Sequence, residues 1–137
     1  MMYREIPSCM LRLSSIISRC NVGEEVSSSL VDALIFALNS ASTEVEISHV
    51  HISATTNGTH GQYSNHYKRR AMDISGINNQ SIYSNQSSEE IKVFQESFDN
   101  YSDIRENFGP YFHHKLGENH NVGGHNDHIH VSTNNCQ

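Results

Sequence analysis

The feature that most constrains the fold is the regular alternation of polar and apolar residues near the C-terminus. Residues 127–132 read Asp127-His128-Ile129-His130-Val131-Ser132. This alternation is typical of a β-strand, where side chains two positions apart point to the same face of the sheet. We therefore expect His128 and His130 to face one site together.

A second segment carries side chains of matching chemistry. Residues 64–74 pass from a polar loop into strand-like sequence and contain His66 and Asp73. Together the two segments offer imidazoles and a carboxylate. Two imidazoles and one carboxylate are a ligand set suited to Zn²⁺, and three protein ligands leave the fourth position for water, as catalytic zinc sites require. The pattern indicates a small zinc hydrolase.

The order and spacing of these residues resemble a family of zinc peptidases. That family includes D-alanyl-D-alanine carboxypeptidases, phage L-alanyl-D-glutamate endolysins, lysostaphin-like enzymes and the hedgehog signalling domain. Its carboxypeptidase and endolysin branch carries Ser-x-His-x-x-Gly-x-Ala-x-Asp, followed far downstream by His-x-His. The resemblance extends from about residue 44 to residue 132, and the matching positions are Ser64, His66, Ala71, Asp73, His128 and His130.

The resemblance implies a role for each residue. His66, Asp73 and His130 would be the zinc ligands, and His128 would be the general base or stabilise the transition state. Zinc lowers the pKa of a bound water to ~7, and a histidine can pass the proton to the leaving amine near neutral pH. Asp127 and Glu118 are alternative acid-base or outer-sphere groups.

The chain departs from the family pattern at two places. Arg69 stands where the family has glycine, and residues 52–60 lack the arginine of the Ser-Gly-Tyr-Arg turn that holds substrate in many relatives. Ser64, Arg69 and Arg70 are the candidate substrate-binding residues, because either arginine can grip a substrate carboxylate. The alternative is that the basic run 68–70 is a solvated turn.

The remaining histidines are expected not to bind metal, because a single histidine on a strand is more often a surface or core residue than a ligand. The segment His49-Val50-His51 is the best internal control, since it is also His-x-His but precedes the His66–Asp73 segment. His60 is intermediate, because its loop should lie near the mouth of the site. The other histidines in this class are His113, His114, His120 and His125.

The periodicity predicts an α+β fold: a small, mostly antiparallel sheet with helices packed on one side. By resemblance the fold would be hedgehog/DD-peptidase-like. Residues 27–41 have apolar side chains at helical spacing, and a second helix follows a capping box of Ser87 and Glu90. Strands are expected at 44–54, 71–74, 111–116 and 127–132. In the first of these the apolar parity changes between Ile47 and Val50, which suggests a bulge or bend. Apolar residues from Ile6 to Ile17 are compatible with a short helix.

Length and charge limit the function further. The 137 residues suit a single domain, and the net charge of −6 disfavours nucleic acid or anionic membrane as a partner. The first residues lack the features of a secretory signal. We therefore expect a peptidase made in the cytoplasm that acts on peptidoglycan stem peptides after release by another factor, as a phage or prophage endolysin would. The alternatives are a non-catalytic zinc-binding module of the same fold and a histidine-rich metal buffer.

Overall fold

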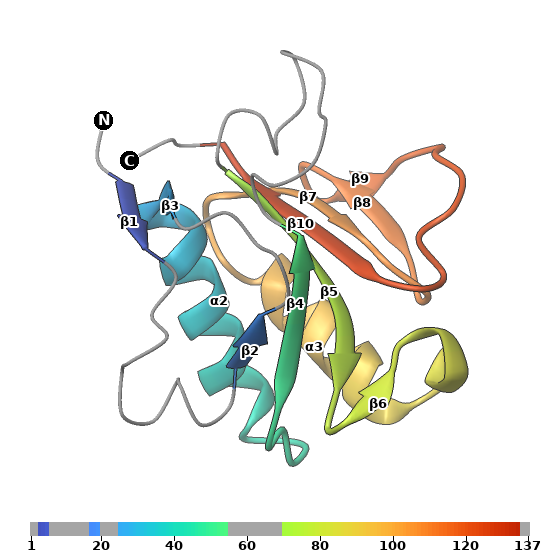
Figure 1. Cartoon of the computed structure of the whole chain (residues 1–137). Helices are drawn as coiled ribbons and strands as arrows, with labels where there is room; N and C mark the ends of the chain where they lie inside the picture. The colour runs from blue at the N-terminus through green and yellow to red at the C-terminus, as the bar shows by residue number, and fades with distance from the viewer. Residues whose placement is uncertain (1–2, 6–16, 20–24, 55–69, 135–137) are drawn as a thin grey trace.

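Eight strands form one sheet, and the two helices of the described residues lie on one side of it (Figure 1). This computed structural model describes residues 3–5, 17–19, 25–54 and 70–134. Every pairing in the sheet is antiparallel except that between β2 and β4. The predicted α+β class with a mostly antiparallel sheet is therefore confirmed.

The strand order places segments distant in sequence side by side. Along the sheet the strands are β2 (Ile17–Arg19), β4 (Val50–Ala54), β5 (Ala71–Ile77), β10 (Ile129–Thr133), β7 (Ile104–Phe108), β8 (His113–Lys115) and β9 (Glu118–Asn119), and β6 (Gln80–Ser81) pairs with β5. A separate two-stranded sheet joins β1 (Tyr3–Glu5) to β3 (Glu25–Ser27). The C-terminal strand β10 thus lies between β5 and β7, at the centre of the main sheet.

Each helix begins at a serine that caps its first turn. The Ser27 hydroxyl accepts a hydrogen bond from the backbone N–H of Leu30, so α2 spans Ser28–Ala41 as its apolar spacing predicts. The second helix, α3 (Glu89–Asp99), is capped by Ser88, whose hydroxyl accepts from the N–H of Ile91. The predicted capping box of Ser87 and Glu90 is therefore wrong by one residue. The helix is preceded by the 3-10 turn η1 (Tyr83–Asn85).

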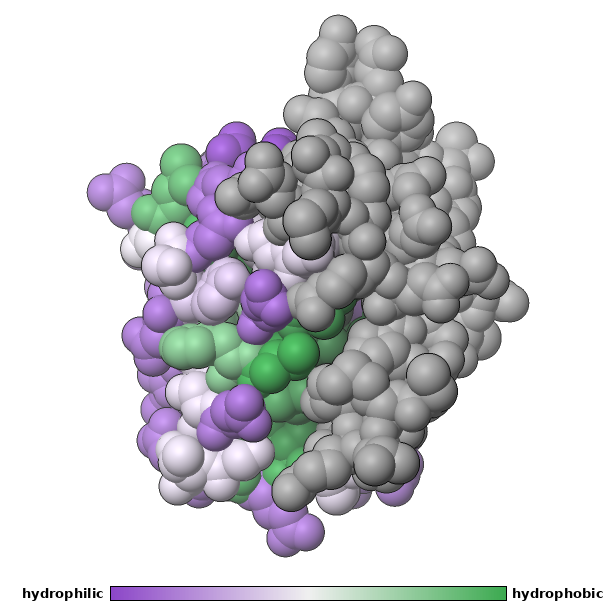
Figure 2. Space-filling model, turned by 90° about the vertical axis from the view of Figure 1, so that its left-hand side faces the viewer, coloured by the Kyte–Doolittle hydropathy of each residue, from purple (hydrophilic) through white to green (hydrophobic). Residues whose placement is uncertain are grey.

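The core lies between the helices and one face of the sheet. Its largest fully buried side chains come from α2, α3 and alternate positions of β4, β5 and β10, and include Leu30, Leu34, Ile52, Met72, Ile74, Phe94, Phe98 and Ile129. Burying side chains of this size stabilises the fold by ~1.5–3 kcal/mol each. Figure 2 looks onto the side where α2 lies in Figure 1 and shows hydrophobic residues gathered across its middle. Phe36 of α2 is 37% exposed, and its ring lies 5.4 Å from that of Tyr101.

Several strand boundaries differ from the prediction. The strand expected at 44–54 begins only at Val50, because residues 42–45 close the last turn of α2 through their backbone N–H groups. The parity change between Ile47 and Val50 falls before the strand begins, and the register against β5 shifts later, on both sides of Ile52. Ile17 lies in a strand instead of a helix, because it pairs with Val50. The strand at 111–116 is confined to β8.

The strand β7 was missed by the periodicity. Its sequence is Ile104-Arg105-Glu106-Asn107-Phe108, with apolar residues only at its ends. Asn107 is nonetheless buried on the helix side, where its amide donates to the backbone carbonyl of Gln95 and to the carboxylate of Asp99. A buried polar side chain needs such partners, and only the packed helix supplies them.

Among the described residues, no helix combines the length and apolar character needed to cross a bilayer.

Candidate functional site

The pairing of β5 with β10 brings two of the predicted zinc ligands together. In this register Asp73 lies opposite His130, although the two are 57 positions apart in the chain. His130 Nδ1 is 3.0 Å from Asp73 Oδ1. Both side chains lie on the sheet face opposite the helices, since their neighbours Met72, Ile74, Ile129 and Val131 belong to the core. A shift of one residue in this pairing would send one of the two side chains into the core.

The third described residue of the predicted site, His128, immediately precedes β10. Its Nε2 lies 3.9 Å from Asp73 Oδ1, and its Nδ1 lies 2.6 Å from Asp127 Oδ1. The carboxylate of Asp127 can only accept, so Nδ1 carries a proton and donates it. In neutral His128 this leaves Nε2 as the basic nitrogen, and it faces Asp73.

The two alternative acid-base residues have different surroundings. Asp127 contacts His128, and the hydrogen bond from that imidazole lowers the pKa of the Asp127 carboxyl below its ordinary value. Glu118 lies in β9 opposite Lys115 and is exposed. Of these two carboxylates, Asp127 is therefore the one that the fold brings to His128.

Glu106 and Ser132 join this site, and the sequence patterns missed both. Glu106 Oε1 lies 3.0 Å from His130 Nε2 and accepts a hydrogen bond of 2.7 Å from the Ser132 hydroxyl. Glu106 faces the site because it lies opposite Ser132 in the pairing of β7 with β10. No local pattern indicated this, because the three consecutive polar residues 105–107 concealed the strand.

His130 is held between two carboxylates, and this changes its titration. Burial by itself would lower the pKa of the imidazole. Hydrogen bonds to Asp73 and Glu106 and the negative charges of both outweigh burial and raise the pKa of His130 to about 9. Without a metal ion the ring is therefore a doubly hydrogen-bonded imidazolium at neutral pH.

The stability of the metal-free protein should consequently fall at alkaline pH. Folding raises the pKa of His130 from 6.5 to about 9. The contribution of His130 to the free energy of unfolding is therefore complete below pH 6.5 and is lost as the pH rises through 9. Denaturant unfolding of metal-free protein across this range should show a decreasing free energy of unfolding. The decrease should be smaller in His130→Gln, which cannot titrate. Equal slopes in the two proteins would contradict this assignment.

Further imidazoles surround the buried ring of Phe108. His130 and His120 stack on it, with centroids at 5.6 and 5.8 Å, and His113 and His125 approach it edge-on at 5.9 and 5.1 Å. Burial and then repulsion by His128 and His130 lower the pKa of His125 below its ordinary value. His125 is therefore a neutral imidazole beside the site.

The donor set agrees in part with a zinc site. Asp73 and His130 are ligand types that Zn²⁺ accepts, and they converge from neighbouring strands. Within the described residues, no group of three or more His, Cys, Asp or Glu side chains is arranged to hold a metal ion. The third predicted ligand, His66, lies outside that part of the chain, as do Ser64, Arg69 and His60.

Arg70 is the one candidate substrate-binding residue that the structure describes. Its Nη1 donates to the backbone carbonyl oxygen of Asn134 at 3.1 Å, and its own carbonyl accepts from the N–H of Thr133. Arg70 thus ties the start of β5 to the end of β10. Its role toward substrate stays a prediction.

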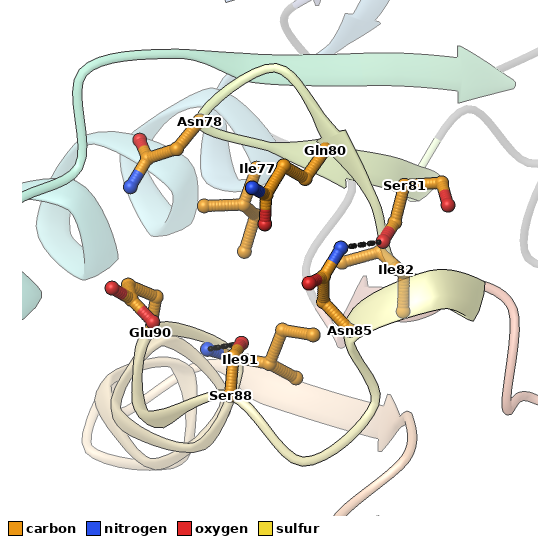
Figure 3. Close-up of a pocket in the computed structure, with 9 residues that line it drawn as sticks. All are labelled: Ile77, Asn78, Gln80, Ser81, Ile82, Asn85, Ser88, Glu90 and Ile91. Atoms are coloured by element: carbon orange, nitrogen blue, oxygen red, sulfur yellow. Dashed lines mark hydrogen bonds between the residues drawn. The ribbon is translucent and has the colours of Figure 1, made fainter.

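The internal control, His49-Val50-His51, lies away from Asp73 and His130. Both histidines line a cavity of about 360 Å³ with Ser75 and Gly76. A smaller cavity of about 160 Å³ lies between the β5–β6 hairpin and the start of α3 (Figure 3). Polar groups of its wall are bonded locally, since Asn85 donates to the Ser81 carbonyl. Neither cavity contains a predicted site residue.

Comparison of the chain with protein-family models, with curated proteins and with solved structures found no match.

Proposed function

We infer that this protein is a zinc-dependent peptidase that hydrolyses peptide bonds of bacterial peptidoglycan, with a hedgehog/DD-peptidase-like fold. The observation that carries this proposal is the contact between Asp73 and His130, with His128 beside them. These are three of the motif residues that pointed to the function, and they come from segments more than fifty residues apart. A chance resemblance in sequence does not require such residues to meet.

The residues that would hold zinc are His66, Asp73 and His130. Asp73 Oδ1 lies 3.0 Å from His130 Nδ1, so these two atoms would be the ones that ligate the metal. When bound there, zinc supplies Lewis acidity and makes a coordinated water acidic near neutral pH. To act as a ligand, His130 Nδ1 would have to give up the proton that it shares with Asp73, because a ligating imidazole nitrogen must be unprotonated.

His128 would move protons during hydrolysis. Asp127 holds the proton on Nδ1, so Nε2 is free to accept one on the side of Asp73. In the forward reaction Nε2 takes the proton of the attacking water and then gives it to the leaving amine. Asp127 would fix the tautomer and stabilise the imidazolium.

The substrate we propose is the stem peptide of the wall, which contains D-amino acids. This assignment comes from the resemblance of the two motifs to enzymes that cut such peptides. The net charge of −6 agrees with a peptide substrate better than with nucleic acid. Acting on the wall after release by another factor, as a phage or prophage endolysin, is part of the same proposal.

If an arginine recognises an anionic group of the peptide, Arg70→Ala should raise KM and leave the zinc content unchanged. The alanine variant would lose a bidentate, charge-assisted contact between the guanidinium and the anionic group of the peptide, and Arg70→Lys would restore that contact poorly. Arg105→Ala is the matched control, because Arg105 also donates to Asn134. In that bond Arg105 Nη1 donates to the side-chain Oδ1 of Asn134 at 3.3 Å. Steady-state kinetics on wall fragments measures the difference. Unchanged kinetics in both Arg69→Ala and Arg70→Ala would remove both arginines from substrate binding.

The direct test of the function combines metal analysis with digestion of purified peptidoglycan. We expect about one zinc ion per chain, since three protein ligands make one site, and release of peptide fragments that stops with a chelator and resumes with zinc. Zinc without cleavage would replace this proposal with a non-catalytic zinc-binding module. A chain that binds no zinc would overturn both functions.

A further inference from the structure

We propose that Glu106 is a positioning residue for His130, and that Ser132 in turn positions Glu106. The proposal rests on the proposed zinc site. Glu106 would hold the imidazole so that Nδ1 faces Asp73 and the metal, while Nε2 is occupied by the carboxylate. Neither Glu106 nor Ser132 belongs to the sequence motifs that pointed to the site.

The geometry of the pair is set by neighbouring strands. Ser132 lies opposite Glu106, and the backbone N–H of Glu106 donates to the Ser132 hydroxyl at 3.2 Å. That hydroxyl donates to Glu106 Oε1 at 2.7 Å. The same Oε1 atom accepts from His130 Nε2 at 3.0 Å. Oε1 of the carboxylate therefore accepts from both the Ser132 hydroxyl and the imidazole.

The orientation of His130 is constrained on three sides. Asp73 contacts Nδ1, Glu106 contacts Nε2, and the ring of Phe108 stacks on its face at 5.6 Å with an interplanar angle of 17°. Rotation about the last side-chain torsion of histidine is broad and roughly two-fold, so backbone position alone does not fix it. The contacts with carboxylates of different strands decide which nitrogen faces which side.

This arrangement matters for metal binding. A metal-ligating histidine commonly donates its other ring N–H to a carboxylate, which fixes the tautomer and makes the ligating nitrogen more basic. Glu106 supplies that acceptor at Nε2. It is not itself expected to bind the same ion as Asp73, because the two carboxylates contact opposite nitrogens of one ring.

The test compares zinc affinity in Glu106→Gln, which keeps the shape of the side chain and removes its charge. We expect zinc to bind ~10–100-fold more weakly, the usual cost of losing an outer-sphere partner. Glu96→Gln is the matched control, because Glu96 is exposed on α3 and the charge change is identical. Ser132→Ala should weaken zinc binding less, and should add little to Glu106→Gln, since both act through one contact.

A second readout reports the ring directly. In zinc-loaded wild-type protein, nitrogen-detected NMR should show His130 protonated at Nε2, with that proton protected from exchange by Glu106. Glu106→Gln should shift this signal, and Glu106→Ala should expose the proton to solvent exchange. A merely structural role for Glu106 would not move the imidazole resonances of a folded variant.

The outcomes separate this proposal from the proposed function. Unchanged zinc affinity and unchanged His130 signals in Glu106→Gln would overturn the positioning role alone. Complete loss of zinc, equal to that in Asp73→Ala, would make Glu106 a ligand and would also overturn it. Wild-type protein without zinc, or zinc retained in both Asp73→Ala and His130→Ala, would instead remove the proposed site.

Discussion

Replacing Asp73 or His130 by alanine is expected to empty the zinc site. Each variant removes one of three protein ligands, and the two donors that remain lack the coordination that protein zinc sites provide. The loss should exceed the ~10–100-fold effect expected for an outer-sphere residue such as Glu106. Metal analysis after dialysis, with circular dichroism to confirm folding, measures it. Asp73→Asn serves as the variant of unchanged shape, and it should also lose zinc.

The controls for this result are two other histidines. His49→Ala should keep zinc, because His49 lines the cavity with Ser75 and lies away from Asp73. His113→Ala should keep zinc as well, since His113 packs against Phe108 and His125. Zinc lost in His49→Ala but kept in His130→Ala would show that the ligands are assigned wrongly.

Replacing His128 by alanine is expected to separate metal binding from hydrolysis. The variant should retain zinc, because Asp73 and His130 keep their contact with one another. Its rate of wall digestion should fall ~10²–10⁴-fold, the typical effect of losing one acid-base group. The physical reason is that Nδ1 of His128 keeps its proton and donates it to Asp127, so Nε2, which faces Asp73, is the basic nitrogen. Zinc content and kcat on the same preparation measure both effects.

Two carboxylate variants refine this prediction. Asp127→Asn should lower kcat by less than His128→Ala, because it removes the acceptor that fixes the tautomer but leaves the imidazole. Glu118→Gln should leave kcat unchanged, since Glu118 is exposed in β9. Near-normal activity in His128→Ala, together with a large loss in Glu118→Gln, would transfer the acid-base role to Glu118.

The pattern of polar and apolar residues predicted the helices and strands that bury one apolar face. The helix at 28–41 appeared because its apolar residues repeat at helical spacing after a serine cap. The strand at 129–133 appeared because polar and apolar residues alternate. The strand at 104–108 did not, because Asn107 replaces an apolar residue on the buried face and is satisfied only by Gln95 and Asp99 of α3.

Some residues of the site could likewise be predicted from the sequence pattern, and others only from the packing of the strands. Spacing alone predicted that His128 and His130 share a face, and motif order paired them with Asp73. Nothing in the local sequence around Glu106 indicates a site residue, because its role depends on the register between β7 and β10. The register also decides that Glu106, instead of the neighbouring Arg105, faces His130.

By itself the sequence determined the motif residues Asp73, His128 and His130, the alternation that turns the two histidines to one face, and the two serine-capped helices. These are properties of neighbours within a few residues, which backbone geometry relates directly. Only the tertiary structure decided that β10 lies between β5 and β7, and hence that His130 is held between Asp73 and Glu106. Strand order and register follow from the burial of a common core, a property of the whole chain that no short segment contains.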